Sequence, residues 1–412
     1  MSDNPSESPS LSPSPPSRSS LLSVAVVFLK LGTLAFGGPA AHIAMMEDEF
    51  VRRRAWLSRA EFLDLLAAAN LIPGPSSTEL AIFVGLRRAG IPGLMVAGCC
   101  FILPAAAIVS AIAAVYVRYG HLPQVMGVLN GVKPVIVAII AQALWGLGKS
   151  ALKSRFLVVL GLCAFLLAMV GLGPAMILLG SASLSGLPAW RNTDNSPDTT
   201  RRARWSVPLT LAGIAALGVG ISARQGGSTG DAGKFGLAPL FLFFLKIGAV
   251  IFGSGYTLLA FLRTDLVDRF HWLTTSQLLD AIAVGQVTPG PLFTTATFIG
   301  YILAGPKGAA VATLGIFLPS FILVAIGAPI IPRLRKSPIT SAFLDGAAAA
   351  AVALMAAVSL QFAQAALRDI PSLLILAVSA VALFRFRVNS AWLIAAGALA
   401  GVLRTGLPIT HH

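Results

Sequence analysis

The chain contains Pro73-Gly74-Pro75-Ser76-Ser77-Thr78, a helix-breaking stretch inside an otherwise apolar segment. Proline lacks a backbone donor and glycine adopts conformations that other residues resist, so no helix is expected to run through this stretch. A similar break, Phe36-Gly37-Gly38-Pro39, lies upstream in another apolar segment. Broken backbone at membrane depth is tolerated only where it is buried in protein or lines a watery cavity.

Both breaks occur again in the second half of the chain, as Phe252-Gly253-Ser254-Gly255 and Thr288-Pro289-Gly290-Pro291. An offset of 216 residues relates Phe28-Leu29-Lys30-Leu31-Gly32 to Phe244-Leu245-Lys246-Ile247-Gly248. Further along, an offset of 215 relates Leu103-Pro104 to Leu318-Pro319. So many matches in one register indicate an internal duplication. Paired breaks in two halves of a membrane protein point to a transport site.

The composition is that of a membrane protein. Of 412 residues, 56% are hydrophobic and 11% are charged, whereas a soluble domain carries about 25% charged residues. Several segments approach the ~20 apolar residues that span a bilayer, and strand-type alternation is absent. The net charge of +14 comes mostly from residues between the apolar segments, which is typical of membrane topology and not of nucleic-acid binding. We therefore predict an all-α polytopic membrane protein.

The duplication divides the chain into four parts. Residues 1–20, rich in Ser and Pro, are expected to form a disordered tail. Residues 21–188 form the first repeat and 237–410 the second. Between them, residues 189–236 form a linker with one extra apolar segment, Val207–Ala223, expected to be a linking membrane helix.

With the extra segment, the number of membrane crossings before the second half is odd, so the two halves are expected to have opposite orientations in the membrane. If each broken segment enters the membrane and returns on the same side, the first half has four crossings and the linking helix makes five. If every segment crosses, the number is again odd. In the first case, in which the broken segments return on the same side, loop and tail Lys and Arg residues number nineteen on one side and eight on the other. The excess predicts a cytoplasmic N-terminus and a periplasmic C-terminus.

The Phe-Gly-Gly-Pro and Pro-Gly-Pro breaks in a duplicated membrane unit resemble the chromate ion transporter family in its long, two-domain form. The resemblance covers about residues 24–187 and 240–407, although the second half has Ser254-Gly255 where the first has Gly38-Pro39. It implies a multi-pass protein of the bacterial inner membrane that exports chromate and confers chromate resistance.

Chromate is a tetrahedral dianion, and a helix that starts after a break offers unpaired N–H groups and the positive end of its dipole. Hydroxyls and amides beside the breaks can add donors, although N-capping of their own helix is the alternative role. We expect the substrate site to contain Gly37, Gly38, Pro39, Asn70, Pro73, Gly74, Pro75, Ser76, Ser77, Thr78, Gly253, Ser254, Gly255, Gln286, Pro289, Gly290, Pro291, Thr294 and Thr295.

Charged residues within the apolar segments extend this site. Lys30 and Lys246 each lie seven residues before a break, so two ammonium groups could balance a dianion; snorkelling to the interface is the alternative. Glu79 directly follows the first Pro-Gly-Pro and is the candidate for proton coupling; its alternatives are to pair with Lys30 or to stabilise the helix start. Lys133 also lies in mid-segment, but its counterpart is Ala348.

Three other polar residues are assigned structural roles. Asp64 and its counterpart Asp280 are expected at entrances or in pairs with Arg. His42 has no partner at metal-ligand spacing, so a role in helix packing is expected and no metal site is predicted.

An enzyme is disfavoured, because the sequence has no His-x-x-x-His or Glu-x-x-His pair and no nucleotide-binding Gly-x-x-x-x-Gly-Lys loop. No cofactor or catalytic residue is predicted. Transport must therefore use an ion gradient or the membrane potential, which contributes ~2.3 kcal/mol per charge per 100 mV. The expected partners are chromate and the lipid bilayer, with sulfate as a competitor; a homodimer is left open. A sulfate transporter of the same architecture is the main alternative, and a scaffold would not need the duplicated breaks.

Overall fold

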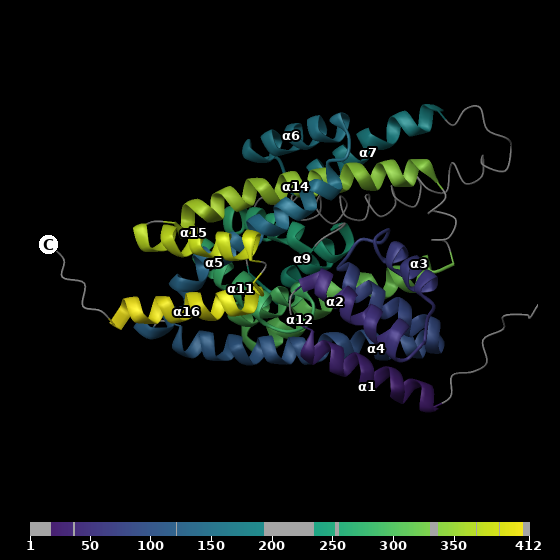
Figure 1. The fold of residues 1–412 in the computed structure, drawn as a ribbon, viewed down its shortest axis with the longest axis horizontal. Coiled ribbons are helices and arrows are strands. Elements are labelled where there is room, and N and C mark those ends of the chain that lie inside the picture. Colours follow the sequence, from purple (N-terminus) through teal and green to yellow (C-terminus); the bar gives the residue numbers. More distant parts are fainter. Residues whose placement is uncertain are drawn as a thin grey trace, which may run out of the picture.

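The computed structural model describes residues 18–35, 38–120, 122–192, 235–251, 255–329, 337–367, 369–386 and 388–406. Within these ranges all regular structure is helical (Figure 1). The predicted linking helix and nearly all of the predicted tail lie outside them, as do Gly37, Gly253 and Ser254 of the expected site.

The first half begins with two short helices on either side of the first break. Its elements are α1 (Arg18–Leu34), α2 (Gly38–Glu47), the π-helix η1 (Asp48–Arg53), α3 (Arg59–Ala69), α4 (Ser76–Tyr119), α5 (Pro123–Ala151), α6 (Arg155–Met169) and α7 (Pro174–Asn192). Ser58 begins α3 with a capping box, in which its hydroxyl accepts from the backbone N–H of Glu61 and the Glu61 carboxylate accepts in return.

The second half repeats this order. Its elements are α9 (Leu237–Val250), η3 (Gly255–Thr257), α10 (Leu258–Phe261), the π-helix η4 (Leu262–Arg269), α11 (Thr275–Val287), η5 (Leu292–Thr294), α12 (Thr295–Gly327), α14 (Pro338–Ala366), α15 (Ile370–Arg385) and α16 (Ser390–Gly406). A second capping box, Thr274 with Gln277, starts α11. The predicted duplication is thus present in three dimensions.

The broken segments fold back on themselves. Lys30 of α1 reaches Glu49 of η1, and the rings of Phe28 and Phe50 lie 5.3 Å apart, so the chain returns beside α1 after the first break. The long α4 reverses at Ala89 and Gly90, where the backbone leaves the helical region. The same backbone angles recur at Ala304 and Gly305 in α12. Each half therefore begins with two helical hairpins.

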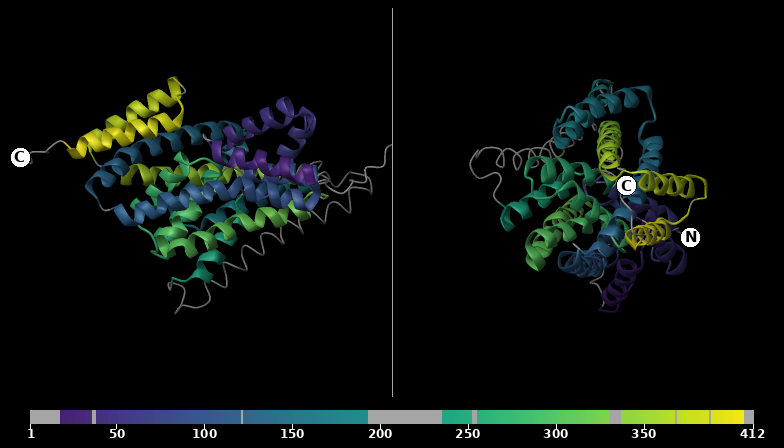
Figure 2. Two further views of the ribbon diagram at one scale, coloured as in Figure 1. Left: turned by 90° about the horizontal axis from the view of Figure 1, so that it is seen from below. Right: turned by 90° about the vertical axis from the view of Figure 1, so that its left-hand side faces the viewer.

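The two halves are interlocked. α4 packs against α12 at the centre, α5 packs against α15 and α16, and α14 packs against α6 and α7. The equivalent helices α7 and α16 point in opposite directions, since α7 ends at the right of Figure 1 and α16 at the left. The two further views in Figure 2 show the same long bundle, with helices of both halves running along its length. The helices of the two halves thus run in opposite senses, as the parity argument predicts.

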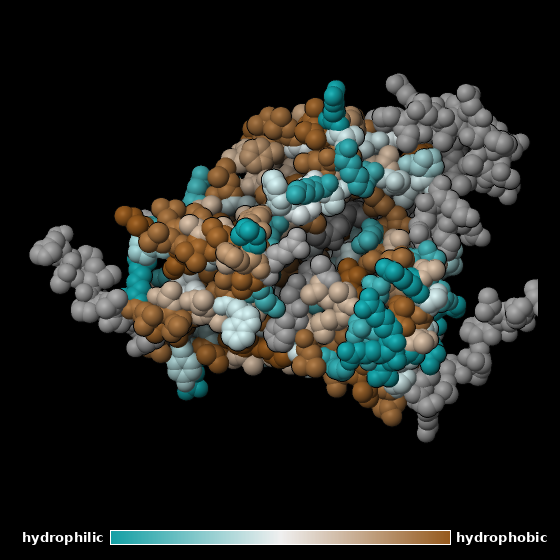
Figure 3. Space-filling view, viewed as in Figure 1, coloured by the Kyte–Doolittle hydropathy of each residue, from teal (hydrophilic) through white to brown (hydrophobic). Residues whose placement is uncertain are grey.

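The surface fits a lipid environment. Among the residues that the structure describes, four helices are long and apolar enough to cross a membrane: Val125–Ala151 and Pro338–Ala366, and also Ser76–Tyr119 and Leu292–Gly327, each counted through its reversal. On α6, Val158, Val159 and Leu162 are exposed apolar side chains. Figure 3 shows much of one face as hydrophobic, while hydrophilic residues gather over the α2 and α3 region. Arg52 of η1 and Arg59 of α3 are both exposed.

Candidate functional site: the junction of the four breaks

The breaks of one half bond to the breaks of the other. The backbone N–H of Gly74, in the first Pro-Gly-Pro, donates to the carbonyl oxygen of Ile251 at 2.7 Å. The backbone N–H of Gly290 donates to the carbonyl oxygen of Ala35 at 2.9 Å. Because the offset of 216 relates both donors and both acceptors, the two bonds are equivalent. They place the breaks around a pseudo-two-fold axis between the halves.

The breaks within each half also touch. His42 of α2 donates from Nε2 to the carbonyl oxygen of Ala35 at 3.0 Å, and its Nδ1 lies 3.5 Å from Ser77 Oγ. In the second half, a Cβ on Gly255 would lie 3.3 Å from Leu292. The four breaks thus form a closed ring. We call it the break junction: Ala35, Gly74, Ile251, Gly290 and the described residues beside them.

Helices start at this junction, as predicted. Gly38 and Pro39 open α2, Ser76 opens α4 directly after Pro75, and η5 starts after Pro291. The N-terminal ends of these helices carry unpaired N–H groups and positive dipole ends. The junction therefore presents positive potential from backbone alone.

The first half supplies unpartnered polar groups. Ser77, Thr78 and Glu79 are buried, and neither Thr78 Oγ1 nor Glu79 Oε2 has a hydrogen-bond partner in the described part of the chain. Glu79 Oε1 accepts a bond from Ser320 Oγ of α12 at 3.4 Å. A Cβ on Gly74 would collide with both Glu79 and Ser320, so the carboxylate lies directly against the break. No cation pairs with Glu79 among the described residues.

The Gly290 side of the junction is less polar than the Gly74 side, against which Glu79 and Ser320 lie. Ala105 and Thr295 stand where the other side has Ser320 and Glu79. The hydroxyls of Thr294 and Thr295 donate to the carbonyl oxygens of Pro291 and Leu292, so they satisfy their own turn. The polar chemistry of the junction is therefore concentrated on its Glu79 side.

The two amides predicted near the breaks lie in different environments. Gln286 Nε2 is buried without a partner. Asn70 is the exposed C-cap of α3, and its own N–H donates to the carbonyl oxygens of Leu66 and Ala68. Pro73, Pro75, Pro289 and Pro291 are all buried.

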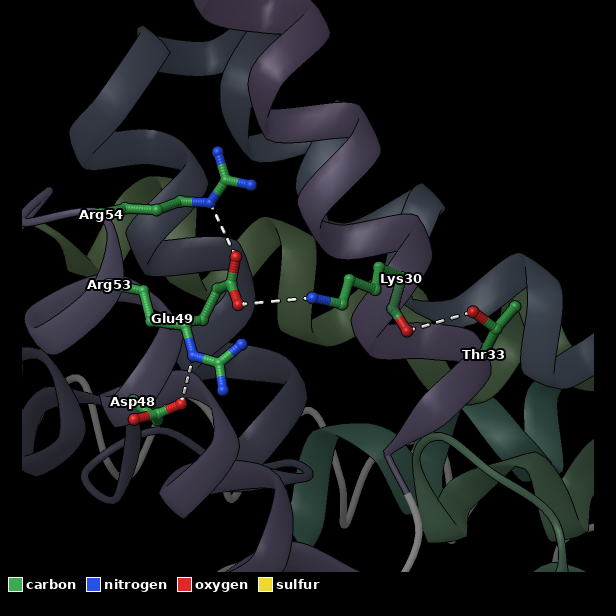
Figure 4. Close-up of polar contacts among 6 residues, drawn as sticks. All are labelled: Lys30, Thr33, Asp48, Glu49, Arg53 and Arg54. Carbon is green, nitrogen blue, oxygen red and sulfur yellow. Dashed lines mark hydrogen bonds and ion pairs between the residues drawn. The ribbon is translucent and has the colours of Figure 1, made fainter.

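Each of the two lysines expected near the anion lies beside a carboxylate. Lys30 is half exposed and its Nζ lies 3.7 Å from Glu49 Oε2, while Arg54 binds the other oxygen at 2.7 Å (Figure 4). Lys246 is buried, with its Nζ 3.2 Å from Asp265 Oδ2. Each lysine is thus neutralised inside its own hairpin, and Lys30 pairs with Glu49 and not with Glu79.

Sequence reasoning missed the two carboxylates that hold these lysines. Glu49 and Asp265 are related by the same offset of 216, so an acidic residue recurs in the repeat register. That match was the available signal. Its importance is visible only once the hairpin brings residues 19 positions apart in sequence, Lys246 and Asp265, into contact.

Comparison with known proteins agrees with this duplicated architecture. The family model described as chromate transporter matches twice, over residues 22–186 and 238–402. The chain belongs to the chromate transporter family. It is 34% identical to the chromate transport protein of Cupriavidus metallidurans over 95% of this chain and 94% of that protein.

Two further relatives are similar over most of their length. The chromate transport protein of Pseudomonas aeruginosa is 34% identical over 84% of this chain and 82% of its own. The probable chromate transport protein of Synechococcus elongatus is 30% identical over 93% of this chain and 95% of its own. No solved structure matches the chain.

Proposed function

We propose that this membrane protein is a secondary transporter that exports chromate from the cytoplasm across the bacterial inner membrane and so confers chromate resistance. The break junction carries the proposal, because four broken helices meet there in a buried ring between two halves. Family membership and the names of the relatives support chromate as the substrate. Sulfate, which has the same shape and charge, is the alternative substrate of the same site.

In this proposal, backbone dipoles and hydroxyls bind the anion. The starts of α2, α4 and η5 direct positive dipole ends to the junction, and helix N-termini bind oxyanions readily. Ser77 and Thr78 add hydroxyl donors, of which Thr78 Oγ1 has no other partner. The paired lysines instead hold the hairpins in place.

Glu79 is the proposed proton carrier. An isolated carboxylate buried without a cation is costly, and a dianion beside it would raise that cost. A proton on Glu79 removes the repulsion and lets the side chain donate to the oxyanion. Binding of the anion at the break junction is thereby linked to protonation of Glu79.

The arginine-rich loops support a membrane orientation with the N-terminus in the cytoplasm. The start of α1 and the end of α16 lie at opposite ends of the bundle (Figure 1). We assign the α1 end to the cytoplasm, because the predicted topology puts Arg52, Arg53, Arg59 and Arg87 on the same side of the membrane as the N-terminus. A negative interior then favours dianion export.

The test is transport by purified protein in liposomes. We expect chromate flux that sulfate inhibits and that responds to voltage and to a proton gradient, each varied separately. Sealed vesicles with correctly inserted protein and no chromate flux above protein-free vesicles would refute the proposal. Flux of sulfate that chromate does not inhibit would favour the alternative substrate.

A further inference from the structure

A second polar site lies apart from the break junction. A cavity of about 480 Å³ is found where α4 ends and where α5 and α11 begin. Its lining includes Tyr116, Asn130, Lys133, Ser276 and Asp280. These residues come from both halves, since α4 and α5 belong to the first and α11 to the second.

The polar groups in this cavity are arranged around one carboxylate. Lys133 Nζ lies 3.3 Å from Asp280 Oδ1 and donates to Ser276 Oγ at 2.7 Å and to Asn130 Oδ1 at 3.3 Å. The Tyr116 hydroxyl donates to Asp280 Oδ2 at 2.9 Å. The Lys133–Asp280 pair is therefore a contact between the two halves, with side chains only 13% and 5% exposed.

The duplication does not reproduce this arrangement. At the equivalent positions the chain has Ala348 in place of Lys133 and an exposed Asp64 in place of Asp280. Lys133 therefore lies at one end of the bundle, where α4 and α16 both end. A lysine present at only one of two equivalent positions indicates a role that differs between the two sides.

The cavity holds the groups that can donate to an oxyanion: the Lys133 ammonium and the Tyr116 hydroxyl, both against Asp280, and the Ser276 hydroxyl beside Lys133. We propose that this cavity is a vestibular site for a tetrahedral oxyanion, in which the anion displaces Asp280 from Lys133 and Tyr116. This proposal rests on the proposed transport function. Asp280 closes the site when it is empty, and an anion leaving the break junction reopens it by binding Lys133.

Equilibrium binding to the purified full-length protein tests the site, with radiolabelled sulfate and chromate as the two probes. Lys133→Met is expected to weaken binding about tenfold, equal to about 1.4 kcal/mol. Asp280→Asn is expected to tighten binding by a factor of about three or more, because it removes the competing charge while keeping a similar shape. Lys153→Met, which breaks an exposed pair with Asp345 of 3.7 Å, is the matched control and should bind as the wild type does.

The opposite signs separate the proposal from a purely structural ion pair, for which both substitutions weaken binding or neither changes it. If Lys133→Met does not fold, the Lys133→Met/Asp280→Asn double variant leaves no unpaired charge and must bind more weakly than Asp280→Asn. If Asp280→Asn binds the labelled anions no more tightly than the wild type does, the vestibular site is refuted. Chromate flux in liposomes would in that case still support the transport function. Tighter binding by Asp280→Asn without any flux would keep the site and reject the transport function.

Discussion

The backbone N–H of Gly74 donates to the carbonyl oxygen of Ile251, across the interface between the two halves, at 2.7 Å. The bond requires the chain to turn sharply inside Pro73-Gly74-Pro75, and Gly74 does so at a φ of +138°. Only glycine adopts this conformation without strain. A Cβ would also collide with Glu79 and Ser320. The glycine thus serves both the turn and the close approach of the halves.

Gly74→Ala is therefore expected to destabilise the protein by ~1–3 kcal/mol, because it combines backbone strain with overpacking. Gly290→Ala, with a φ of +89° and Ala105 against its Cβ, should behave in the same way. Both variants should also lose most chromate flux. Thermal unfolding in detergent and flux in liposomes measure the two effects.

The control for these glycines is Gly180→Ala. Gly180 lies in α7, and a Cβ there meets nothing within 4 Å. Alanine has the higher helix propensity, so stability should stay equal or rise slightly. An equal loss of stability in Gly180→Ala and Gly74→Ala would show that the junction is not special.

Much of the fold could be predicted because it depends on local signals. Proline and glycine interrupt the helices where expected, since α4 begins at Ser76 directly after Pro73-Gly74-Pro75. The duplication could be read from a fixed offset, and the odd number of crossings predicted halves of opposite direction. The packing of α6 and α7 against α14 could not be predicted, since the apolar faces of membrane helices carry little information about partners.

Within the candidate site, the sequence predicted the positions of the helix breaks, because Pro and Gly determine them locally. Pro-Gly-Pro predicted the breaks, but the ring that joins them depends on contacts between residues such as Ala35 and Gly290, far apart in sequence. The sequence analysis did not find the carboxylates beside the two lysines, because Glu49 and Asp265 lie in η1 and η4, the returning segments of the two hairpins. Membrane depth alone does not reveal whether a charge is already paired.

Glu79→Gln is expected to remove the dependence of chromate flux on a proton gradient while retaining flux driven by voltage. Glutamine keeps the shape and can still accept from Ser320 Oγ, but it cannot carry the transported proton. The measurement is flux at fixed voltage across a range of pH gradients. An unchanged pH dependence would exclude Glu79 as the proton carrier, and Glu61→Gln, at an exposed residue, controls for a general effect of charge.

Asp369 gives a prediction about pH at the end of the bundle. The Arg404 guanidinium binds it at 2.6 Å and lowers the pKa of Asp369 from 3.8 to about 2. Asp369 also caps α15 by accepting from the N–H of Ser372. Because the pKa of Asp369 is lower in the folded state, its ionised carboxylate stabilises the folded protein above pH 3.8. This contribution to stability is lost as the pH falls towards 2.

The difference in stability between the wild type and Asp369→Asn should therefore be constant above about pH 5 and shrink between about pH 4 and 2. Asparagine retains the cap, so the comparison isolates the charge. Because both side chains are more than a third exposed, salt should reduce the difference. Thermal unfolding at several pH values measures it, and a difference that grows on acidification would contradict the assignment.

The last prediction concerns the two equivalent lysines. Lys246 and Asp265 are both buried, so Lys246→Met leaves a buried, unpaired carboxylate and should cost ~3–5 kcal/mol of stability. Lys30 is half exposed, and its partner Glu49 keeps the bond from Arg54. Lys30→Met should therefore change stability by less than ~1 kcal/mol. Thermal or denaturant unfolding of the purified variants gives both values.

A second substitution separates the structural role of these lysines from anion binding. If Lys246 serves to hold its hairpin, adding Asp265→Leu to Lys246→Met removes the unpaired charge and should restore most of the stability, because buried ion pairs are often replaced by apolar residues without loss. If instead the two ammonium groups bind the dianion, Lys30→Met and Lys246→Met should both weaken chromate binding by tenfold or more, and Asp265→Leu should rescue neither. Rescue of stability with wild-type chromate affinity would leave the anion to the helix ends of the break junction. Weakened affinity in both lysine variants at unchanged stability would instead place the lysines in the substrate site.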